Sequence, residues 1–282
     1  MLYLNLIVTL FENTNFSLFN SYIFMNFIHT EQKNNVLIIT LNRADKFNSF
    51  NREMALQLIA ELDEAEKEKT VRAIVLTGKG KAFCAGQDLA EAIDPNGPGI
   101  KKIVDEHYNP IILRIRNIEK PIIGSINGVA AGAGANIALA CDILLAGKSA
   151  SFIQAFSKIG LIPDSGGTFT LPRLVGLNLA SALMITGDKL SAEDAKGFGM
   201  VYKVYEDAEL VEKTLELATN IASMPTQAIG FTKRLINASA TNNLEQQLKL
   251  EGDIQVKASN SYDYKEGVKA FLEKRKPEFK GE

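Results

Sequence analysis

Residues 127–143 read NGVAAGAGANIALACDI, and this stretch decides which folds the chain can adopt. The run at its start, residues 121–127, and the run at its end, residues 142–146, are short and apolar, as buried strands are. Between them, residues 132–140 are apolar on every side, which predicts a buried helix. The apolar stretch of about 13 residues is too short to span a membrane, which takes ~20. A buried strand–helix–strand unit is therefore predicted.

The N-terminal side continues this alternation. Residues 36–41 and residues 73–77 are β-branched and apolar runs, and both predict strands. Between them Asn51 is suited to cap an amphipathic helix, whose apolar residues recur at helical spacing: Met54, Leu58, Ile59, Leu62 and Ala65. Alternating elements of this kind favour an α/β fold. The glycines of residues 128–134 lack the GxGxxG spacing, so a dinucleotide-binding fold is not expected.

The C-terminal part of the chain is mostly helical. Residues 191–194 (SAED) have the pattern of a capping box at the start of a helix. Residues 201–204 predict a last strand, and three or four helices follow, the first two separated by Pro225. We therefore place a core at residues 25–205 and a helical region at residues 206–282.

The first 24 residues differ from the rest. They are rich in Phe, Leu and Ile, but Glu12 and several asparagines interrupt them, and they lack the basic start and the cleavage site of a signal peptide. They are also too polar for a spanning helix. We expect residues 1–24 to be an artefact of upstream translation or a disordered extension, with the natural start at Met25.

The bulk composition indicates a soluble, cytoplasmic globular protein. The 282 residues are 46% hydrophobic and 23% charged, with a formal net charge of -2. Such a chain has no basic surface for nucleic acid or an anionic membrane. The two cysteines, Cys84 and Cys141, and the two histidines, His29 and His107, show no metal-binding pattern. We expect reduced, buried thiols and no metal site.

Three segments bring small residues to places where a ligand could approach the main chain: FCAGQDL (83–89), residues 127–143 and GLIPDSGGTFTLPRLVG (160–176). The second also opens a helix after a strand, where free N–H groups and the positive end of the helix dipole converge. Such donors stabilise a thioester oxygen that gains negative charge. The alternative is close packing of a glycine-rich helix on the sheet, and spacing alone does not decide between the two.

Asp164 is the only acidic residue of the third segment. Its neighbours Leu161, Ile162 and Phe169 are apolar, and burial among them would raise the pKa of the carboxyl toward a value useful to a general base. The alternative is that Asp164 caps a helix that begins at GGTFTL. Both interpretations stay open at this point.

These segments, in this order, resemble the crotonase (enoyl-CoA hydratase/isomerase) superfamily over residues 36–279. FCAGQDL is similar to the first oxyanion segment of that family, GVAAGAGANIALACDI to the second, and FLEKRKPEF (271–279) to the tail that contacts coenzyme A. The resemblance implies an α/β fold, a crotonase-like spiral of ββα turns with a C-terminal helical trimerisation region. It also implies a homotrimer, or a hexamer built as a dimer of trimers.

The resemblance gives individual residues a role. The N–H groups of Ala85 and Ala133 would form an oxyanion hole beside the catalytic Asp164. Lys46 would lie near the CoA phosphates, and Phe271 and Lys274 of the tail would approach the nucleotide from a neighbouring subunit. No cofactor is implied, because coenzyme A is part of the acyl-CoA substrate. The substrate-binding residues, from the lysine to the tail, would be Lys46, Ala85, Gly86, Gln87, Asp88, Leu89, Gly132, Phe271 and Lys274.

Departures from the family pattern select among its activities. Hydratases carry two glutamates that activate water, where this chain has Asn136 and Phe156, so water addition should be poor. Asp164 instead matches the single catalytic carboxylate of several enoyl-CoA and dienoyl-CoA isomerases. Ala44 stands where the family usually has proline, which affects only the expected geometry of that loop.

The resemblance therefore implies an isomerase that transposes C=C bonds. AGQDL, GVAAGAGA and KIGLIPDSGGT are most similar to members that convert ring-1,2-epoxyphenylacetyl-CoA to oxepin-CoA in phenylacetate catabolism. A shift of a Δ3 to a Δ2 enoyl-CoA double bond needs the same groups. A generic Δ3,Δ2-enoyl-CoA isomerase or an enoyl-CoA hydratase is the alternative within the family, and a non-catalytic acyl-CoA-binding subunit is the alternative of another class.

Overall fold

The strands of the protein form two sheets in a computed structural model that describes residues 26–282; the expected artefact or extension at residues 1–24 lies outside that range. The six-stranded sheet has the order β1-β2-β3-β5-β7-β10, and only β1 and β2 pair antiparallel. The four-stranded sheet has the order β4-β6-β8-β9, and only β8 and β9 pair antiparallel. The strands are β1 (Ile28–Lys33), β2 (Val36–Leu41), β3 (Ala73–Gly78), β4 (Ala82–Cys84), β5 (Ile122–Ile126), β6 (Val129–Ala131), β7 (Ile143–Gly147), β8 (Ser151–Ile153), β9 (Lys189–Ser191) and β10 (Lys203–Tyr205).

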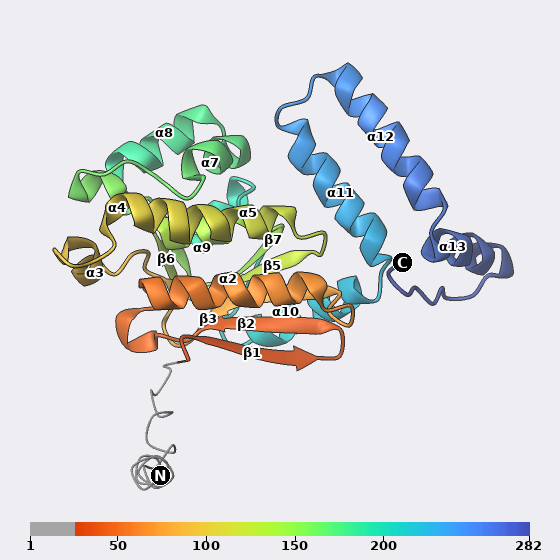
Figure 1. The fold of residues 1–282 in the computed structure, drawn as a ribbon, viewed down its shortest axis with the longest axis horizontal. Helices are drawn as coiled ribbons and strands as arrows, with labels where there is room; N and C mark the ends of the chain where they lie inside the picture. Colours follow the sequence, from red (N-terminus) through yellow and green to blue (C-terminus); the bar gives the residue numbers. More distant parts are fainter. Residues whose placement is uncertain (1–25) are drawn as a thin grey trace, which may run out of the picture.

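From β3 to β8, successive strands alternate between the sheets, and this confirms the predicted spiral of ββα turns. Strands β3, β5 and β7 of the large sheet, labelled in Figure 1, are each followed directly in the chain by β4, β6 and β8 of the small sheet. Helices return the chain to the large sheet after β4 and β6, and after β8 they lead first to β9 of the small sheet. The helical segments are η1 (Ala44–Lys46), α2 (Arg52–Lys67), α3 (Leu89–Ile93), α4 (Gly99–Lys102), the π-helical η2 (Ile103–Tyr108), α5 (Asn109–Asn117), α6 (Ala133–Ala140), η3 (Ala155–Ile159), α7 (Gly167–Val175), α8 (Leu177–Thr186), α9 (Ala192–Gly197), α10 (Leu210–Ala222), α11 (Thr226–Ser239), α12 (Leu244–Ser259) and α13 (Tyr262–Glu273).

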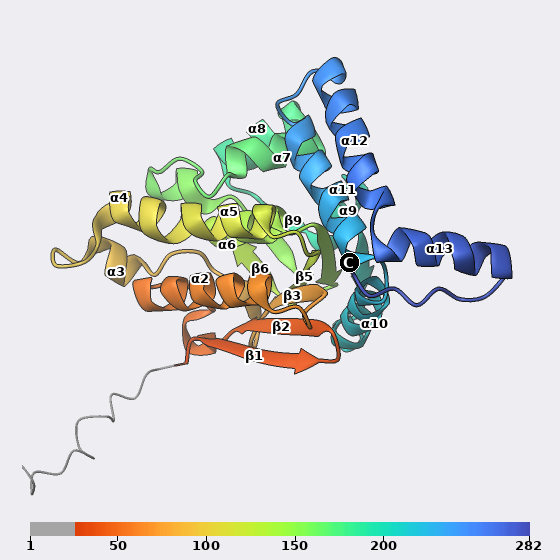
Figure 2. The same cartoon turned by 45° about the vertical axis from the view of Figure 1, so that its right-hand side comes forward.

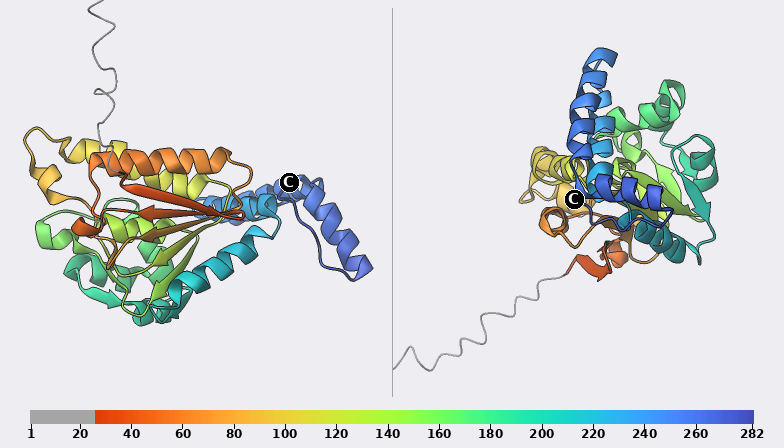
Figure 3. Two further views of the ribbon diagram at one scale, coloured as in Figure 1. Left: turned by 90° about the horizontal axis from the view of Figure 1, so that it is seen from below. Right: turned by 90° about the vertical axis from the view of Figure 1, so that its right-hand side faces the viewer.

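The large sheet is buried on both faces, because alternate side chains of a strand point to opposite sides. On β3, Ile74 and Leu76 join the main core with α2 and α5, whereas Ala73 and Val75 join a second core with α10. Helix α10 is therefore part of the core, although it follows the boundary predicted at residue 205. The helices that leave the core are α11, α12 and α13, which project beyond the sheets in Figures 2 and 3.

Elements with a clear hydrophobic period are confirmed. Strand β2 spans the predicted residues, and β3, β5, β7 and α6 lie within one residue of their predicted bounds. Asn51 caps α2 as predicted, accepting a hydrogen bond from the Met54 N–H at 3.0 Å. Ser191 caps α9, but the return bond of a capping box is absent, since the third residue is Asp194, whose carboxylate bonds the Ser191 hydroxyl instead. The predicted strand at residues 201–204 shifts to β10.

Both cysteines are buried and unpaired. Within residues 26–282, no group of three or more His, Cys, Asp or Glu side chains is placed to hold a metal ion. Among the helices of the same range, none combines the length and the apolar character that crossing a bilayer requires.

Asn48 joins two loops that position the candidate site. Its side chain is fully buried and donates to the carbonyl oxygens of Ala82 at 2.9 Å and Lys79 at 3.0 Å. Its carbonyl oxygen accepts from the Arg43 N–H at 2.9 Å. The residue also adopts a left-handed conformation, φ 56°, which asparagine tolerates better than most residues. One amide side chain thus holds the turn after β2 against β4.

Replacing Asn48 by alanine should lower the free energy of unfolding by roughly 2 to 4 kcal/mol, because buried partners lose their hydrogen bonds. Urea unfolding of the purified variant measures this loss. The matched control is Asn96→Ala, at an exposed loop position, which should change the stability by less than about 0.5 kcal/mol. Equal losses in the two variants would contradict the role given to Asn48.

Candidate active site

The start of α6 offers main-chain N–H groups that the protein itself leaves free. Gly132, the residue before the helix, has φ 54° and donates its own N–H to the Ile153 carbonyl at 2.8 Å. The N–H of Ala133, the first helical residue, has no acceptor within residues 26–282. The first turn of any helix carries such unpaired donors, and the helix dipole adds a positive potential there. A partial negative charge is therefore favoured beside Ala133.

Gly86 brings the segment 83–89 into main-chain contact with this helix start. A Cβ atom at residue 86 would lie 2.9 Å from the Ala131 carbonyl oxygen and 3.5 Å from the Ala133 nitrogen. The residue also has φ 92°, a conformation that side chains disfavour. Only glycine permits this close approach, and Gln87 is the next residue of the segment.

The predicted donor on this segment was wrong. The N–H of Ala85 already donates to the Phe47 carbonyl at 3.0 Å, and one N–H carries only one hydrogen. Gln87 and Phe50 form a parallel β-bridge. The main-chain hydrogen bonds of this bridge join Phe50 to the two residues that flank Gln87. The N–H of Gln87 consequently points away from that bridge and has no acceptor in the described chain. Gln87 and Ala133 thus carry free donors on the two segments that Gly86 brings into contact.

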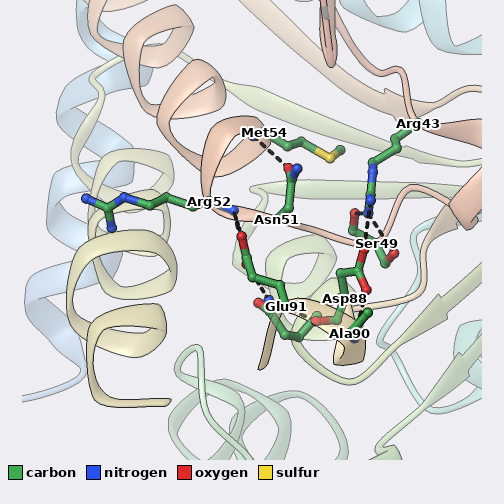
Figure 4. Close-up of polar contacts among 9 residues, drawn as sticks. Arg43, Ser49, Asn51, Arg52, Met54, Asp88, Ala90 and Glu91 are labelled. Atoms are coloured by element: carbon green, nitrogen blue, oxygen red, sulfur yellow. Dashed lines mark hydrogen bonds and ion pairs between the residues drawn. The ribbon is translucent and has the colours of Figure 1, made fainter. Parts of the chain in front are cut away.

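The side chain of Gln87 is held at both ends. Its carbonyl oxygen accepts from the Tyr108 hydroxyl at 2.9 Å, and its amide nitrogen donates to the Glu91 carboxylate at 2.9 Å. Glu91 in turn accepts from the main-chain N–H of Arg52 at 2.8 Å, where α2 begins (Figure 4). The orientation of the Gln87 peptide is therefore fixed by contacts with η2 and α3.

The negative charge of the Asp88 carboxylate is balanced by groups of the protein. It accepts from Arg43 at 2.7 Å and from the Ala90 N–H at 3.0 Å (Figure 4). Burial acts to raise the pKa of the Asp88 carboxyl, but these hydrogen bonds and the charges of Arg43 and Lys46 outweigh it and lower the pKa. Asp88 thus stays ionised, and its carboxylate bonds groups of the protein. Lys46 is exposed nearby, and its ammonium group is accessible to an anionic ligand.

Asp164 has the opposite surroundings. Its main-chain oxygen accepts from the Asn136 side chain at 2.8 Å, which fixes the residue against α6, one turn beyond Ala133. Its carboxylate accepts from the Ser165 hydroxyl at 2.8 Å. Burial raises the pKa of this carboxyl, and the bond from Ser165 acts against that rise. A raised pKa makes a carboxylate a stronger base, which suits it to general acid–base work.

The alternative that Asp164 caps a helix is wrong. Helix α7 begins after Gly166, and no side chain caps it. Two left-handed residues, Ser165 with φ 52° and Gly166 with φ 71°, separate the aspartate from the helix and turn its side chain away from the first-turn N–H groups. The carboxylate is therefore not needed to complete α7.

Asn136 and Phe156, the positions that differ from the hydratase pattern, are both buried. The Asn136 side chain bridges Asp164 and the Gln154 amide, from which it accepts at 2.8 Å. The ring of Phe156 lies over Gly132, since a Cβ there would be 3.8 Å from its Cζ. Neither residue supplies a carboxylate beside the free amides.

Other predicted positions lie apart within one chain. Phe271 is 83% exposed on α13, and Lys274 follows at the end of that helix. In Figures 1 and 2, α13 lies at the opposite side of the molecule from α3 and α4, which flank the 83–89 segment. The chain does not bring these two residues to its own free amides.

Sequence reasoning missed the groups that support the site. Tyr108 lies in a π-helical turn, and such turns often mark functional positions in otherwise regular helices. The phenol is 1% exposed, and burial raises its pKa well above the usual value. Glu91 lies four residues after Gln87, a spacing at which helical side chains meet, and this was an available signal. No local pattern indicated that Ser165 contacts the carboxylate.

Known proteins are similar to this chain in both sequence and fold. The family model described as enoyl-CoA hydratase/isomerase matches residues 31–282. The chain is 47% identical to 1,2-epoxyphenylacetyl-CoA isomerase of Escherichia coli K12, over 91% of this chain and 99% of that protein. It is 36% identical to trans-2-decenoyl-[acyl-carrier-protein] isomerase of Streptococcus mutans, over 88% of this chain and 95% of that protein. The crystal structure of enoyl-CoA hydratase from Bacillus anthracis superimposes with a TM-score of 0.85 at 35% identity, covering 91% of this chain and all of that one.

Gly86→Ala tests the main-chain contact at the free amides. The added methyl group would push the segment away from Ala131 and displace the Gln87 donor, so kcat/KM should fall by roughly 10²-fold or more. Steady-state kinetics with an acyl-CoA substrate measures this loss. Gly176→Ala is the matched control, because Gly176 has φ 80° with open space around it. It should share the backbone strain of about 1 to 2 kcal/mol but keep its activity, and a similar kinetic loss in both variants would refute the contact's role.

Proposed function

Because the chain belongs to the enoyl-CoA hydratase/isomerase family, we propose that it is an acyl-CoA isomerase in which Asp164 acts as a single acid/base. The observation that carries this proposal is one half-buried carboxylate fixed by Asn136 against the helix whose first N–H groups are free. The two positions at which hydratases hold glutamates contain Asn136 and Phe156, which cannot transfer protons to water.

The mechanism needs only groups of the chain. The thioester oxygen lies between the N–H groups of Gln87 and Ala133, where each donor stabilises developing negative charge by about 3 kcal/mol. Asp164 removes a proton from the acyl chain, so a C–H bond breaks and its electron pair passes into the enolate. The protonated Asp164 then returns the proton to another carbon, and the double bond has moved. No external cofactor or metal enters this balance.

Ring-1,2-epoxyphenylacetyl-CoA is our proposed substrate. The support is the 47% identity to the Escherichia coli isomerase over nearly the full length of both chains. For this substrate, enolisation coupled to opening of the bicyclic ring system would give the seven-membered oxepin-CoA, within phenylacetate catabolism. A Δ3-to-Δ2 shift on a simple enoyl-CoA would use the same carboxylate and the same amides.

Two alternatives are separable by assay. A generic Δ3,Δ2-enoyl-CoA isomerase would turn over 3-hexenoyl-CoA faster than epoxyphenylacetyl-CoA, and a hydratase would add water to 2-hexenoyl-CoA. A non-catalytic acyl-CoA-binding subunit would bind these thioesters and convert none of them. The supported position of Asp164 favours catalysis over mere binding.

Binding of the CoA moiety extends the proposal to the surface of the molecule. Residues 85–89 and Gly132 would line the pantetheine path, with the exposed Lys46 near the phosphates. Phe271 and Lys274 would reach the nucleotide from a neighbouring copy, since α13 projects away from its own core. We therefore propose a cytoplasmic homotrimer, or a hexamer built from two trimers.

Asp164→Asn keeps the shape of the side chain but removes the base. Turnover of the preferred acyl-CoA should fall by roughly 10²-fold or more, the usual contribution of general acid–base catalysis, while thioester binding should persist. Rates and calorimetric affinities measured on the same preparation check both expectations. Wild-type turnover by this variant would overturn the assignment of Asp164.

A further inference from the structure

Ser165 adopts a conformation that a glycine would hold with less strain. Its φ is 52°, in the left-handed region, and only 3% of the residue is exposed. The next residue, Gly166, is left-handed as well, with φ 71°. Non-glycine residues in this region are uncommon and often belong to functional sites. The serine side chain must therefore supply something that glycine lacks.

The hydroxyl of Ser165 contacts the catalytic carboxylate directly. Its Oγ donates to Oδ1 of Asp164 at 2.8 Å. The other carboxylate oxygen, Oδ2, accepts no hydrogen bond from another residue of the described chain. The main-chain oxygen of Asp164 is held separately, by Asn136. Ser165 thus holds the carboxylate at Oδ1 and Asn136 holds the main chain, and no other residue of the described chain occupies Oδ2.

The charges around Asp164 do not replace this hydrogen bond. Lys158 of η3 lies against Gly187, and Arg173 of α7 lies over the ring of Phe169. On α5, Arg114 pairs with Asp63 at 2.6 Å, and Arg116 pairs with Asp142 at 3.4 Å. The phenol of Tyr108 on η2 is neutral because burial raises its pKa, and the charge of Asp164 adds to this rise. Helix α6 carries no charged residue.

We propose that Ser165 is the positioning residue of the isomerase, whose hydroxyl holds Oδ1 so that Oδ2 alone takes the proton from the acyl chain and returns it. This inference rests on the proposed function. The hydroxyl keeps its own proton throughout, while a C–H bond breaks and an O–H bond forms at Oδ2. A donated hydrogen bond favours the ionised carboxylate, so Ser165 also keeps the base ready at a lower pH than burial alone would allow.

Ser165→Gly is the sharpest test, because glycine accepts the left-handed conformation and lacks the hydroxymethyl side chain. Loss of the bond raises the pKa of Asp164, and the base must be ionised to act, so the acid limb of kcat/KM moves to higher pH. The plateau rate at high pH should stay within a few-fold of wild type. Profiles with 3-hexenoyl-CoA and with epoxyphenylacetyl-CoA, over the pH range in which the variant stays folded, measure this shift.

Two further variants separate the hydroxyl from the backbone. Ser165→Ala should show the same shift of the acid limb as Ser165→Gly. Its melting temperature should be lower than that of Ser165→Gly, because alanine is strained in the left-handed conformation and glycine is not. Ser149→Gly, at an exposed position, should leave the profile unchanged. An acid limb of Ser165→Gly that coincides with wild type, or a rate that falls equally at every pH, would overturn the proposal.

A readout independent of turnover keeps this inference distinct from the proposed function. Carbon-13 NMR of labelled aspartate, with the Asp164 signal assigned from Asp164→Asn, follows the titration of the carboxyl directly. It should move to higher pH in Ser165→Gly, and an unmoved titration would refute the hydrogen bond's role. If Asp164→Asn stays active while the titration moves, the proposed function fails and the contact between the two residues stands.

Discussion

The arrangement of the site depends on one main-chain contact, that of Gly86 with the start of α6. A side chain at residue 86 would meet the Ala131 carbonyl oxygen at 2.9 Å, so the two segments can approach this closely only through glycine. The two segments joined in this way carry the free N–H groups of Gln87 and Ala133. Two donors that are fixed before a ligand arrives do not have to reorganise as charge develops, and this is why such sites stabilise an enolate.

Two aspartates of the site, Asp88 and Asp164, differ because of their partners. Asp88 is surrounded by Arg43, Lys46 and a main-chain N–H, which together lower its pKa in spite of burial. Asp164 has a hydroxyl and no cation, so burial prevails and its pKa is raised. The first carboxylate is committed to holding the loops together. The second retains the ability to exchange a proton, and the chemistry that we propose depends on this contrast.

Asn136 shows how a change of side chain changes the use of a position. Its amide both donates and accepts, and it joins Asp164 to Gln154 across the site. A glutamate could accept hydrogen bonds there but could not donate to the Asp164 carbonyl. The absence of a carboxylate at this position and the placement of the carboxylate at residue 164 are therefore linked. The hydrogen bond of 2.8 Å from Asn136 joins the two positions.

Local sequence determined the elements that have a strong period or a cap, such as β2, α2 with its Asn51 cap, and α6, because these depend on neighbours within a few residues. It also identified Asp164 as the acid to consider. Tertiary structure alone decided which amides are free, since the N–H of Ala85 is taken by Phe47, 38 positions earlier in the chain. It likewise decided that Asp164 faces Ser165 instead of capping α7, because the direction of a side chain follows from the backbone turn around it.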